Sequence, residues 1–299
     1  MKIADLISSI NQFESLKKFM NDNNISKSDT QANQNFLENF IQNYHECKEG
    51  KLEDCLQTPK GYQPFLEWNH KMFYAGSKHC AHWIKSNKNY EIKKNFIYSD
   101  YDVDDNPETL MSYHSKIKKG EVVDNSRIKY LEIVSDIIKN DYKKGVYLSG
   151  LPGVGKTFLL QLTANQFALK QKVAFITVSN LIKTIKDGFS NNETQKENLL
   201  RTLMNVDCLF IDDIGGEVVT AYSRDEILFT LLNYRMENKK TTFFSANFSL
   251  NKLDVIYGVA EINCSDREII KTKTDRFVER VKGLVTQDHM IMGENKRHS

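Results

Sequence analysis

The sequence predicts an α/β fold, a parallel sheet sandwiched by helices, preceded by a small, largely helical N-terminal domain. From about Arg127 onward, short apolar strands alternate with helical segments, as expected for strands buried on both faces of a sheet. The first of these strands runs directly into a glycine-rich turn, GLPGVGKT. Residues 45–85 differ in character, because Cys, His, Gly, Pro and aromatic residues gather there without a clear period.

Length and charge limit the classes of protein that remain. The chain has 299 residues, and at about 150 residues per domain this predicts two domains. A net charge of +2 excludes a protein that bulk charge holds on nucleic acid. The mean hydropathy is -0.51, and no apolar run in the sequence approaches the ~20 residues of a membrane span. We therefore expect a cytoplasmic protein with no membrane partner.

The N-terminal part is expected to be helical over residues 1–44, where apolar residues recur at helical spacing on both sides of a polar stretch at 21–35. A charged segment follows residues 45–85, and the Asp- and Asn-rich stretch Tyr98–Pro107 is typical of a loop. The predicted organisation is an N-terminal domain at 1–90, a linker at 91–125 and a C-terminal domain at 126–299.

The C-terminal domain is expected to contain four buried strands and the helices between them. The strands are predicted at 146–149, 173–178, 208–213 and 241–247. The helices are predicted at 157–170, 197–204, 224–237 and 266–282, after an earlier helical face formed by Leu131, Val134 and Ile138. Cys208 lies inside a strand and is expected to be an ordinary buried residue, and Cys264 stands alone.

The glycine-rich turn matches the phosphate-binding pattern G-x-x-x-x-G-K-[ST], placed between a strand and a helix as that pattern requires. Its glycines let successive N–H groups face a phosphate, and the helix that follows adds its dipole. Lys156 is expected to reach the β- and γ-phosphates, and Thr157 to bind Mg²⁺. The nucleotide-binding residues that we predict in the turn are Gly150, Pro152, Gly153, Val154, Gly155, Lys156, Thr157 and Phe158.

Two strand ends downstream supply the remaining polar groups of an ATP site. Asp212 and Asp213 close the strand CLFIDD, where Asp212 is expected to hold the Mg²⁺ shell and Asp213 to orient or deprotonate the attacking water. Asp213 is one carbon shorter than the usual Glu, which favours slow hydrolysis. Asn247 ends the next strand, where its amide can contact both the γ-phosphate and the water.

Two arginines lie one turn apart near the C-terminus. Arg276 and Arg280 are at positions i and i+4 of a predicted helix, so they share one face. A guanidinium suits phosphate in its fork geometry, and from this helix it can act as an arginine finger on the ATP of a neighbouring subunit. The alternative is a salt-bridged surface helix.

These motifs and the sequence segments between them resemble a known protein family. VDCLFIDDIGGE, the run from Arg224 to Leu250 and the closing VERVKGL resemble the bacterial helicase loaders of the DnaC/DnaI family, which includes primosomal protein DnaI. The resemblance covers about residues 95–299, and its most specific part runs from the aspartate pair through Asn247. It implies an AAA+ P-loop NTPase core. Only 19 residues follow Arg280 in the sequence given, too few for the C-terminal helical lid of other AAA+ proteins.

The resemblance implies a function and its partners. Such loaders use ATP to place the hexameric replicative helicase on single-stranded DNA during replication initiation or restart. The resemblance implies that Asn247 is the sensor residue and Arg280 the arginine finger. Because a core without a lid closes its site poorly, we expect self-assembly on the helicase ring to stimulate ATP hydrolysis. The family has an extra DNA-facing helix after the second strand, where Lys183 and Lys186 share a face. A solvated lysine face is the alternative there.

The resemblance also implies zinc in the N-terminal domain, where helicase binding is expected. Seven of the twelve Cys and His residues lie within positions 45–82. Three thiolates and one imidazole make a tetrahedral zinc shell, and the spacing alone is weak support. The expected ligands are Cys47, Cys55 and Cys80 with either His70 or His82.

Three other functions remain open from the sequence. A transposition-accessory ATPase of the IstB type shares this core without a Cys-rich N-terminal domain of this kind. A P-loop small-molecule kinase needs an acceptor site and lid residues that we do not find in the sequence. A nucleotide-gated adaptor binds the helicase and barely hydrolyses ATP.

Overall fold

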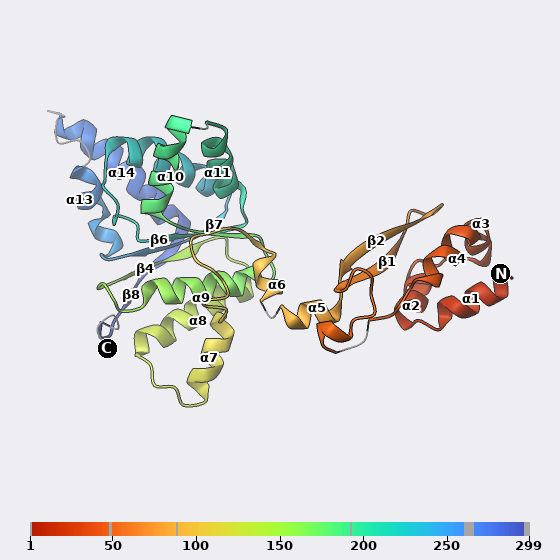
Figure 1. Cartoon of the computed structure of the whole chain (residues 1–299). Coiled ribbons are helices and arrows are strands. Elements are labelled where there is room, and N and C mark those ends of the chain that lie inside the picture. Colours follow the sequence, from red (N-terminus) through yellow and green to blue (C-terminus); the bar gives the residue numbers. More distant parts are fainter. Residues whose placement is uncertain (1, 48–49, 88, 192, 260–265, 296–299) are drawn as a thin grey trace. The chain divides into compact units, whose positions relative to one another are not determined.

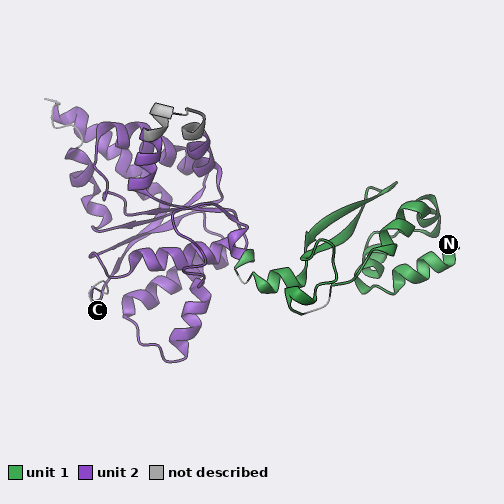
Figure 2. Cartoon of the chain, viewed as in Figure 1, with its two compact units in different colours: residues 1–90 green, residues 91–299 purple. Residues whose placement is uncertain are grey.

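The chain divides into two compact units, residues 1–90 and 91–299 (Figure 2). The computed structural model describes residues 2–47, 50–87, 89–191, 193–259 and 266–295, so Cys264 lies outside the described residues. Among the described residues, no helix combines the length and the apolar character that crossing a membrane requires.

Unit 1 consists of a small helical cluster and one β-hairpin. The hairpin strands pair in antiparallel register from Tyr62 opposite His79 to Trp68 opposite Phe73. Their inner side chains join the helices in one core, which includes Leu6, Leu37 and Phe73. The elements are α1 (Ile3–Asn11), α2 (Glu14–Asp22), α3 (Lys27–Ala32), α4 (Gln34–Gln42), η1 (Leu52–Asp54), β1 (Tyr62–Trp68), β2 (Phe73–His79) and α5 (Ala81–Ser86), with α6 (Tyr90–Lys93) at the boundary of the units.

Unit 2 is built on a six-stranded sheet in the order β3-β5-β6-β7-β4-β8. Every neighbouring pair of these strands is parallel, which confirms the predicted fold class. The strands are β3 (Phe96–Ser99), β4 (Gly145–Gly150), β5 (Val173–Thr177), β6 (Cys208–Asp212), β7 (Thr241–Ala246) and β8 (Val285–Ile291). Cys208 is fully buried in β6, as predicted.

Helices cover both faces of this sheet (Figure 1). One face packs against α7 (Leu110–Lys118), α8 (Asn125–Asn140) and α9 (Lys156–Ala168). The other packs against α10 (Val178–Asn191), α11 (Glu193–Asn205), η2 (Tyr222–Leu228), α12 (Phe229–Glu237), α13 (Leu253–Gly258) and α14 (Arg267–Leu284), with the short turn η3 (Leu250–Lys252). Among the described residues, α14 is followed by β8 and by no further helix.

The predicted linker at 91–125 is wrong for most of its length. Its residues form the edge strand β3, which pairs with β5, and helix α7, whose Leu110 and Tyr113 are buried against the sheet. The strand was missed because four residues, FIYS, give too short a pattern, and the polar loop behind it dominates the local composition. The polar residues of β8, VTQDHMI, hid the other edge strand in the same way.

Candidate functional site

The carboxyl ends of four parallel strands meet at one edge of the sheet. Thr177 at the end of β5 pairs with Asp212 at the end of β6, and Ser149 of β4 pairs with Ala246 of β7. This register brings the glycine-rich turn after β4, the aspartate pair and Asn247 to the same edge. Ligands of open α/β sheets bind at such an edge.

The glycine-rich turn leads into α9 as predicted. Gly155 has a φ of +90°, a left-handed conformation that glycine adopts without strain, and α9 begins at the next residue. The largely buried Lys156 turns back over the loop, where its ammonium donates to the carbonyls of Gly150 and Leu151 at 3.0 and 2.9 Å. It also donates to Asn247 Oδ1 at 2.8 Å.

Asp212 lies deep in the site and contacts two hydroxyl groups. Thr157 Oγ1 donates to its two carboxylate oxygens at 3.1 and 3.0 Å, and the hydroxyl of Ser245 donates to it as well. Burial raises the pKa of Asp212, and these hydrogen bonds oppose the rise. A carboxylate beside a threonine hydroxyl is a donor set that Mg²⁺ accepts together with phosphate oxygens, so these residues fit the ion.

Asp213 is held in a different way. Its φ is +56°, its N–H donates to Ser245 Oγ at 3.0 Å, and its Oδ1 accepts from Asn247 Nδ2 at 2.8 Å. Asn247 therefore contacts Lys156 with its oxygen and Asp213 with its nitrogen. The three residues predicted from separate motifs lie in one hydrogen-bonded group.

A cavity of about 490 Å³ opens over this group. The sequence did not identify three of its lining residues, Thr177, Ser179 and Ser245. Ser245 had a usable signal, because it lies two residues before Asn247 and thus on the same side of the predicted strand at 241–247. The full lining consists of Pro152, Gly153, Gly155, Lys156, Thr157, Thr177, Ser179, Asp212, Asp213, Ser245 and Asn247.

Two predicted nucleotide-binding residues turn their side chains away from this cavity. Val154 is buried among the apolar residues that α9 contributes to the sheet. Phe158 packs edge-on against Tyr113, with ring centroids 5.5 Å apart. Val154 and Phe158 can therefore contact a bound nucleotide only through their backbone groups.

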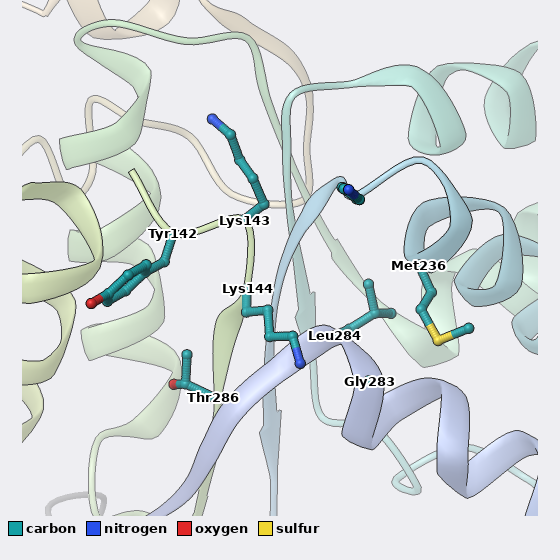
Figure 3. A pocket seen from close by; sticks show the side chains of 8 residues that line it. Tyr142, Lys143, Lys144, Met236, Gly283, Leu284 and Thr286 are labelled. Carbon is teal, nitrogen blue, oxygen red and sulfur yellow. The ribbon is translucent and has the colours of Figure 1, made fainter. Parts of the chain in front are cut away.

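A second pocket, of about 450 Å³, lies at the amino end of β4 (Figure 3). Tyr142, Met236 and Leu284 provide its apolar surface, and Lys144 is among the lysines beside them. No carboxylate, histidine or cysteine belongs to its described lining. The chemistry suggested by the motifs is therefore confined to the carboxyl edge of the sheet.

The two predicted finger arginines lie on α14, which packs on α12 and α13. Arg280 donates from Nε to Asn233 Oδ1 at 2.5 Å. The guanidinium carbons of Arg276 and Arg280 stand 4.9 and 5.4 Å from the ring centroid of Phe229. Neither arginine lines the cavity of its own chain.

Lys183 and Lys186 are exposed on α10, whose first residues border the cavity. Ile182 and Ile185 of the same helix are buried. The two lysines therefore share the solvent-facing side of the helix, as their spacing predicts.

In unit 1, three predicted metal ligands come together as Cys47, Cys80 and His82, with ligand atoms within 4.8 Å of one another. The Sγ of Cys80 lies 3.7 Å from that of Cys55 and 4.0 Å from His82 Nδ1. Across tetrahedral zinc, these separations are about 3.8 and 3.5 Å. Cys47 Sγ is 2.7 Å from His82 Nδ1. For both atoms to coordinate one zinc ion, this separation has to increase by about 1 Å.

Of the two histidines that the sequence leaves open as the fourth ligand, His70 lies away from the cluster. It is exposed in the turn between β1 and β2, with a φ of +69°. Cys80 directly follows the opposite end of this hairpin, about 20 Å away along the seven residues of β2. His82 lies on α5, two residues after Cys80, which places its ring in the cluster. Cys55 contacts Cys80, so the donor set is three thiols and one imidazole, a set that fits zinc.

Comparisons with known proteins agree with this geometry. Residues 124–257 match the family model of the bacterial DnaA ATPase domain. The chain is 28% identical to the replicative helicase loader DnaI of Bacillus subtilis (strain 168) over 271 residues, which cover 88% of this chain and 82% of that protein. It is 34% identical to the replicative helicase loader DnaC of Escherichia coli (strain K12) over 111 residues, 37% of this chain and 45% of DnaC.

A solved DnaI structure has the same fold, with a TM-score of 0.54 and 24% identity over 69% of this chain and 100% of that chain. The resemblance to the DnaC/DnaI helicase loaders is thus confirmed, and unit 2 has the fold of their AAA+ domain.

Replacing Lys156 tests the site. Lys156→Ala removes the ammonium that lies between the turn and Asn247, so we expect ATP affinity to fall at least a hundredfold, as loss of a buried charge contact to phosphate would cause. Titration with a fluorescent ATP analogue measures it. Lys170→Ala, just beyond the other end of α9, is the matched control and should bind normally. Equal affinity in both variants would refute the assignment.

Proposed function

We propose that this chain, a relative of the DnaI and DnaC helicase loaders, is an ATP-dependent loader of the replicative DNA helicase onto single-stranded DNA. The observation that carries the proposal is the group formed by Lys156, Asn247 and Asp213 at the carboxyl edge of the sheet. It occurs in a chain whose similarity to a named helicase loader extends through both units. The proposed location of the chain is the cytoplasm, where a bacterial replicative helicase acts.

The site residues have distinct roles in this proposal. Lys156 and the backbone of the turn bind the phosphates, and Thr157 and Asp212 hold Mg²⁺, which draws charge from the phosphate oxygens. Asp213 accepts a proton from the attacking water, and Asn247 orients that water. The Asp213 carboxylate is one methylene shorter than a glutamate, which supports slow hydrolysis. The same feature favours the second candidate, a nucleotide-gated adaptor with little turnover.

Arg280 is proposed to act on the site of a neighbouring chain. Its contacts with Asn233 and Phe229 hold it on the surface of α12, and no arginine is among the described residues that line its own cavity. Lys156 and Mg²⁺ balance only part of the charge that develops in the transition state, and an arginine in trans supplies a further cation. Assembly on the helicase ring would then stimulate ATP hydrolysis.

Single-stranded DNA is proposed to bind along α10 through Lys183 and Lys186. The lysines share the exposed side of the helix, and phosphate contacts need no base-specific geometry. The first turn of α10 contributes Ser179 to the nucleotide cavity. One helix thus borders the nucleotide and presents cations to DNA.

Binding to the helicase provides the direct test of the function. We expect the chain to form a stable complex with the hexameric replicative helicase of its own organism, and its ATPase rate to rise at least tenfold when helicase and single-stranded DNA are both present. Lys156→Ala should still bind the helicase, because the proposed helicase-binding region is unit 1. Light scattering coupled to gel filtration measures complex formation, and the release of inorganic phosphate measures the ATPase rate.

A helicase complex without stimulated turnover would favour the adaptor. Absence of any complex, with the purified chain folded and ATP present, would contradict the loader and leave a different AAA+ function, such as a transposition accessory.

Zinc is proposed to occupy the cluster of Cys47, Cys55, Cys80 and His82. Protein purified without added metal should contain about one zinc per chain by atomic absorption, and Cys80→Ser should lose it, because each ligand contributes to both affinity and folding. His70→Ala is the matched control and should retain the ion. Loss of zinc in His70→Ala with retention in His82→Ala would overturn the ligand set.

A further inference from the structure

A series of polar contacts runs from the nucleotide cavity toward helix α14. It begins at Asn247, which joins the ammonium of Lys156 to the carboxylate of Asp213. Phosphate oxygens compete for the same ammonium with charge-assisted hydrogen bonds. Nucleotide binding therefore acts on the first contact of the series.

The next contact is between Asp213 and the turn after β6. The N–H of Gly216 donates to the carbonyl of Asp213 at 3.0 Å. A Cβ added to Gly216 would stand 2.2 Å from Asp213 Oδ2, so the carboxylate rests directly on this backbone. Because no space separates them, a reorientation of the Asp213 side chain toward Gly216 displaces the turn.

Glu217 fastens the turn to helix α13. Its Oε2 accepts from the N–H of Gly215 at 2.8 Å, and its Oε1 accepts from the hydroxyl of Tyr257 at 2.6 Å. Burial raises the pKa of Glu217. Tyr257 is fully buried, and its ring packs on Phe277 of α14 with centroids 4.4 Å apart.

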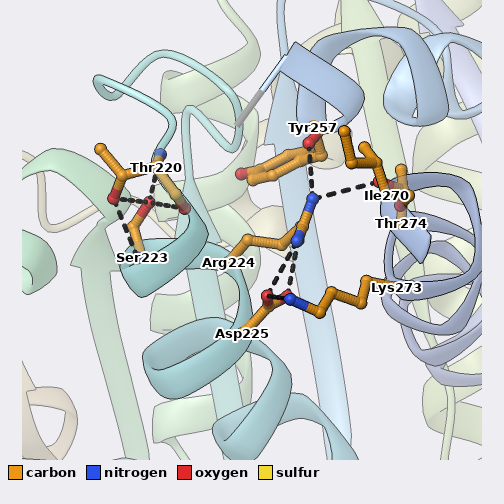
Figure 4. Close-up of polar contacts among 8 residues, drawn as sticks. All are labelled: Thr220, Ser223, Arg224, Asp225, Tyr257, Ile270, Lys273 and Thr274. Atoms are coloured by element: carbon orange, nitrogen blue, oxygen red, sulfur yellow. Dashed lines mark hydrogen bonds and ion pairs between the residues drawn. The ribbon is translucent and has the colours of Figure 1, made fainter. Parts of the chain in front are cut away.

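Arg224 continues the series from α13 to α14 (Figure 4). Its Nη1 donates both to the carbonyl of Tyr257, at 3.1 Å, and to Thr274 Oγ1 on α14, at 3.2 Å. The guanidinium is fully buried and pairs with Asp225 at 2.6 Å, which in turn lies 3.7 Å from Lys273 Nζ on α14. Two independent side chains of α14 are thus tied to η2, a π-helical segment of a kind that recurs at functional sites.

We propose that Glu217, Tyr257 and Arg224 are positioning residues that couple the nucleotide site to α14 and thereby orient Arg280. The proposal rests on the proposed function, in which Arg280 serves a neighbouring site. Buried polar contacts suit this role, because each unmatched donor or acceptor is costly and the arrangement changes as a unit. Nucleotide binding in one chain thus changes the orientation of that chain's Arg280 toward the ATP site of its neighbour.

Tyr257→Phe interrupts the series with little change in packing. The ring on Phe277 is kept, and only the hydroxyl that serves Glu217 is lost. We expect ATP affinity within twofold of wild type and a stimulated kcat at least tenfold lower. Tyr130→Phe is the matched control, since it also removes a hydroxyl from a fully buried tyrosine, one bonded to Thr163 at 2.8 Å. Its stimulated kcat should remain within twofold of wild type.

Mixed assemblies show which site the variant damages. Asp213→Asn chains keep Arg280 and lack the base, and the amide retains the shape of the carboxylate and an oxygen that accepts from Asn247. Arg280→Ala chains keep the base and lack the finger. Tyr257→Phe should regain turnover when mixed with Asp213→Asn and not when mixed with Arg280→Ala. The reverse pattern would show that Tyr257 serves only its own site, and this would overturn the coupling.

Amide hydrogen exchange tests the coupling even if Arg280 is not the finger. Binding of a non-hydrolysable ATP analogue should change the exchange of residues 267–284 in the wild type. It should leave them unchanged in Tyr257→Phe and in Thr274→Val, which removes the acceptor on α14, while protection of the phosphate-binding turn is retained. An undiminished response of α14 in both variants would overturn the proposal. Failed complementation between Arg280→Ala and Asp213→Asn would instead count against the finger.

Discussion

The in-register parallel pairing of β5, β6, β7 and β4 is the constraint on which the site depends. Thr177 opposite Asp212 and Ser149 opposite Ala246 fix where each strand ends. A shift of one residue in β6 would turn Asp212 to the other face of the sheet. The apolar side chains of these strands, buried on both faces, therefore determine the positions of the polar groups at the strand ends.

At this edge, two adjacent aspartates differ because their surroundings differ. Asp212 is enclosed and accepts hydrogen bonds from Thr157 and Ser245, an environment suited to a metal ligand. Asp213 follows in a left-handed conformation, which directs its carboxylate toward Asn247 and the open cavity. The left-handed residue thus separates the two carboxylates into a buried one and an accessible one. The turn beyond it then connects the site with α13 and α14 through buried polar contacts.

The sequence was most informative where one local pattern determines the geometry. The glycine-rich turn, the aspartate pair and Asn247 each lie at the end of a strongly apolar strand, so their meeting follows from parallel topology. The edge strands β3 and β8 could not be found in this way, because one is four residues long and the other is largely polar.

Tertiary contacts decided the rest. The choice between His70 and His82 depended on the direction of a hairpin, which spacing along the chain does not give. The contact of Glu217 with Tyr257 joins residues 40 positions apart, and no motif links them. The side-chain directions of Val154 and Phe158 were likewise set by the core beneath the turn.

The claim that each ATP site is completed by a neighbouring chain is tested most directly by mixing Arg280→Ala with Asp213→Asn on the helicase and single-stranded DNA. Each variant alone should lack stimulated hydrolysis. In an equal mixture, about a quarter of head-to-tail interfaces pair an intact base with an intact arginine, so about a quarter of the wild-type stimulated rate should return. No recovery at any mixing ratio, with both variants folded and bound to the helicase, would contradict the account.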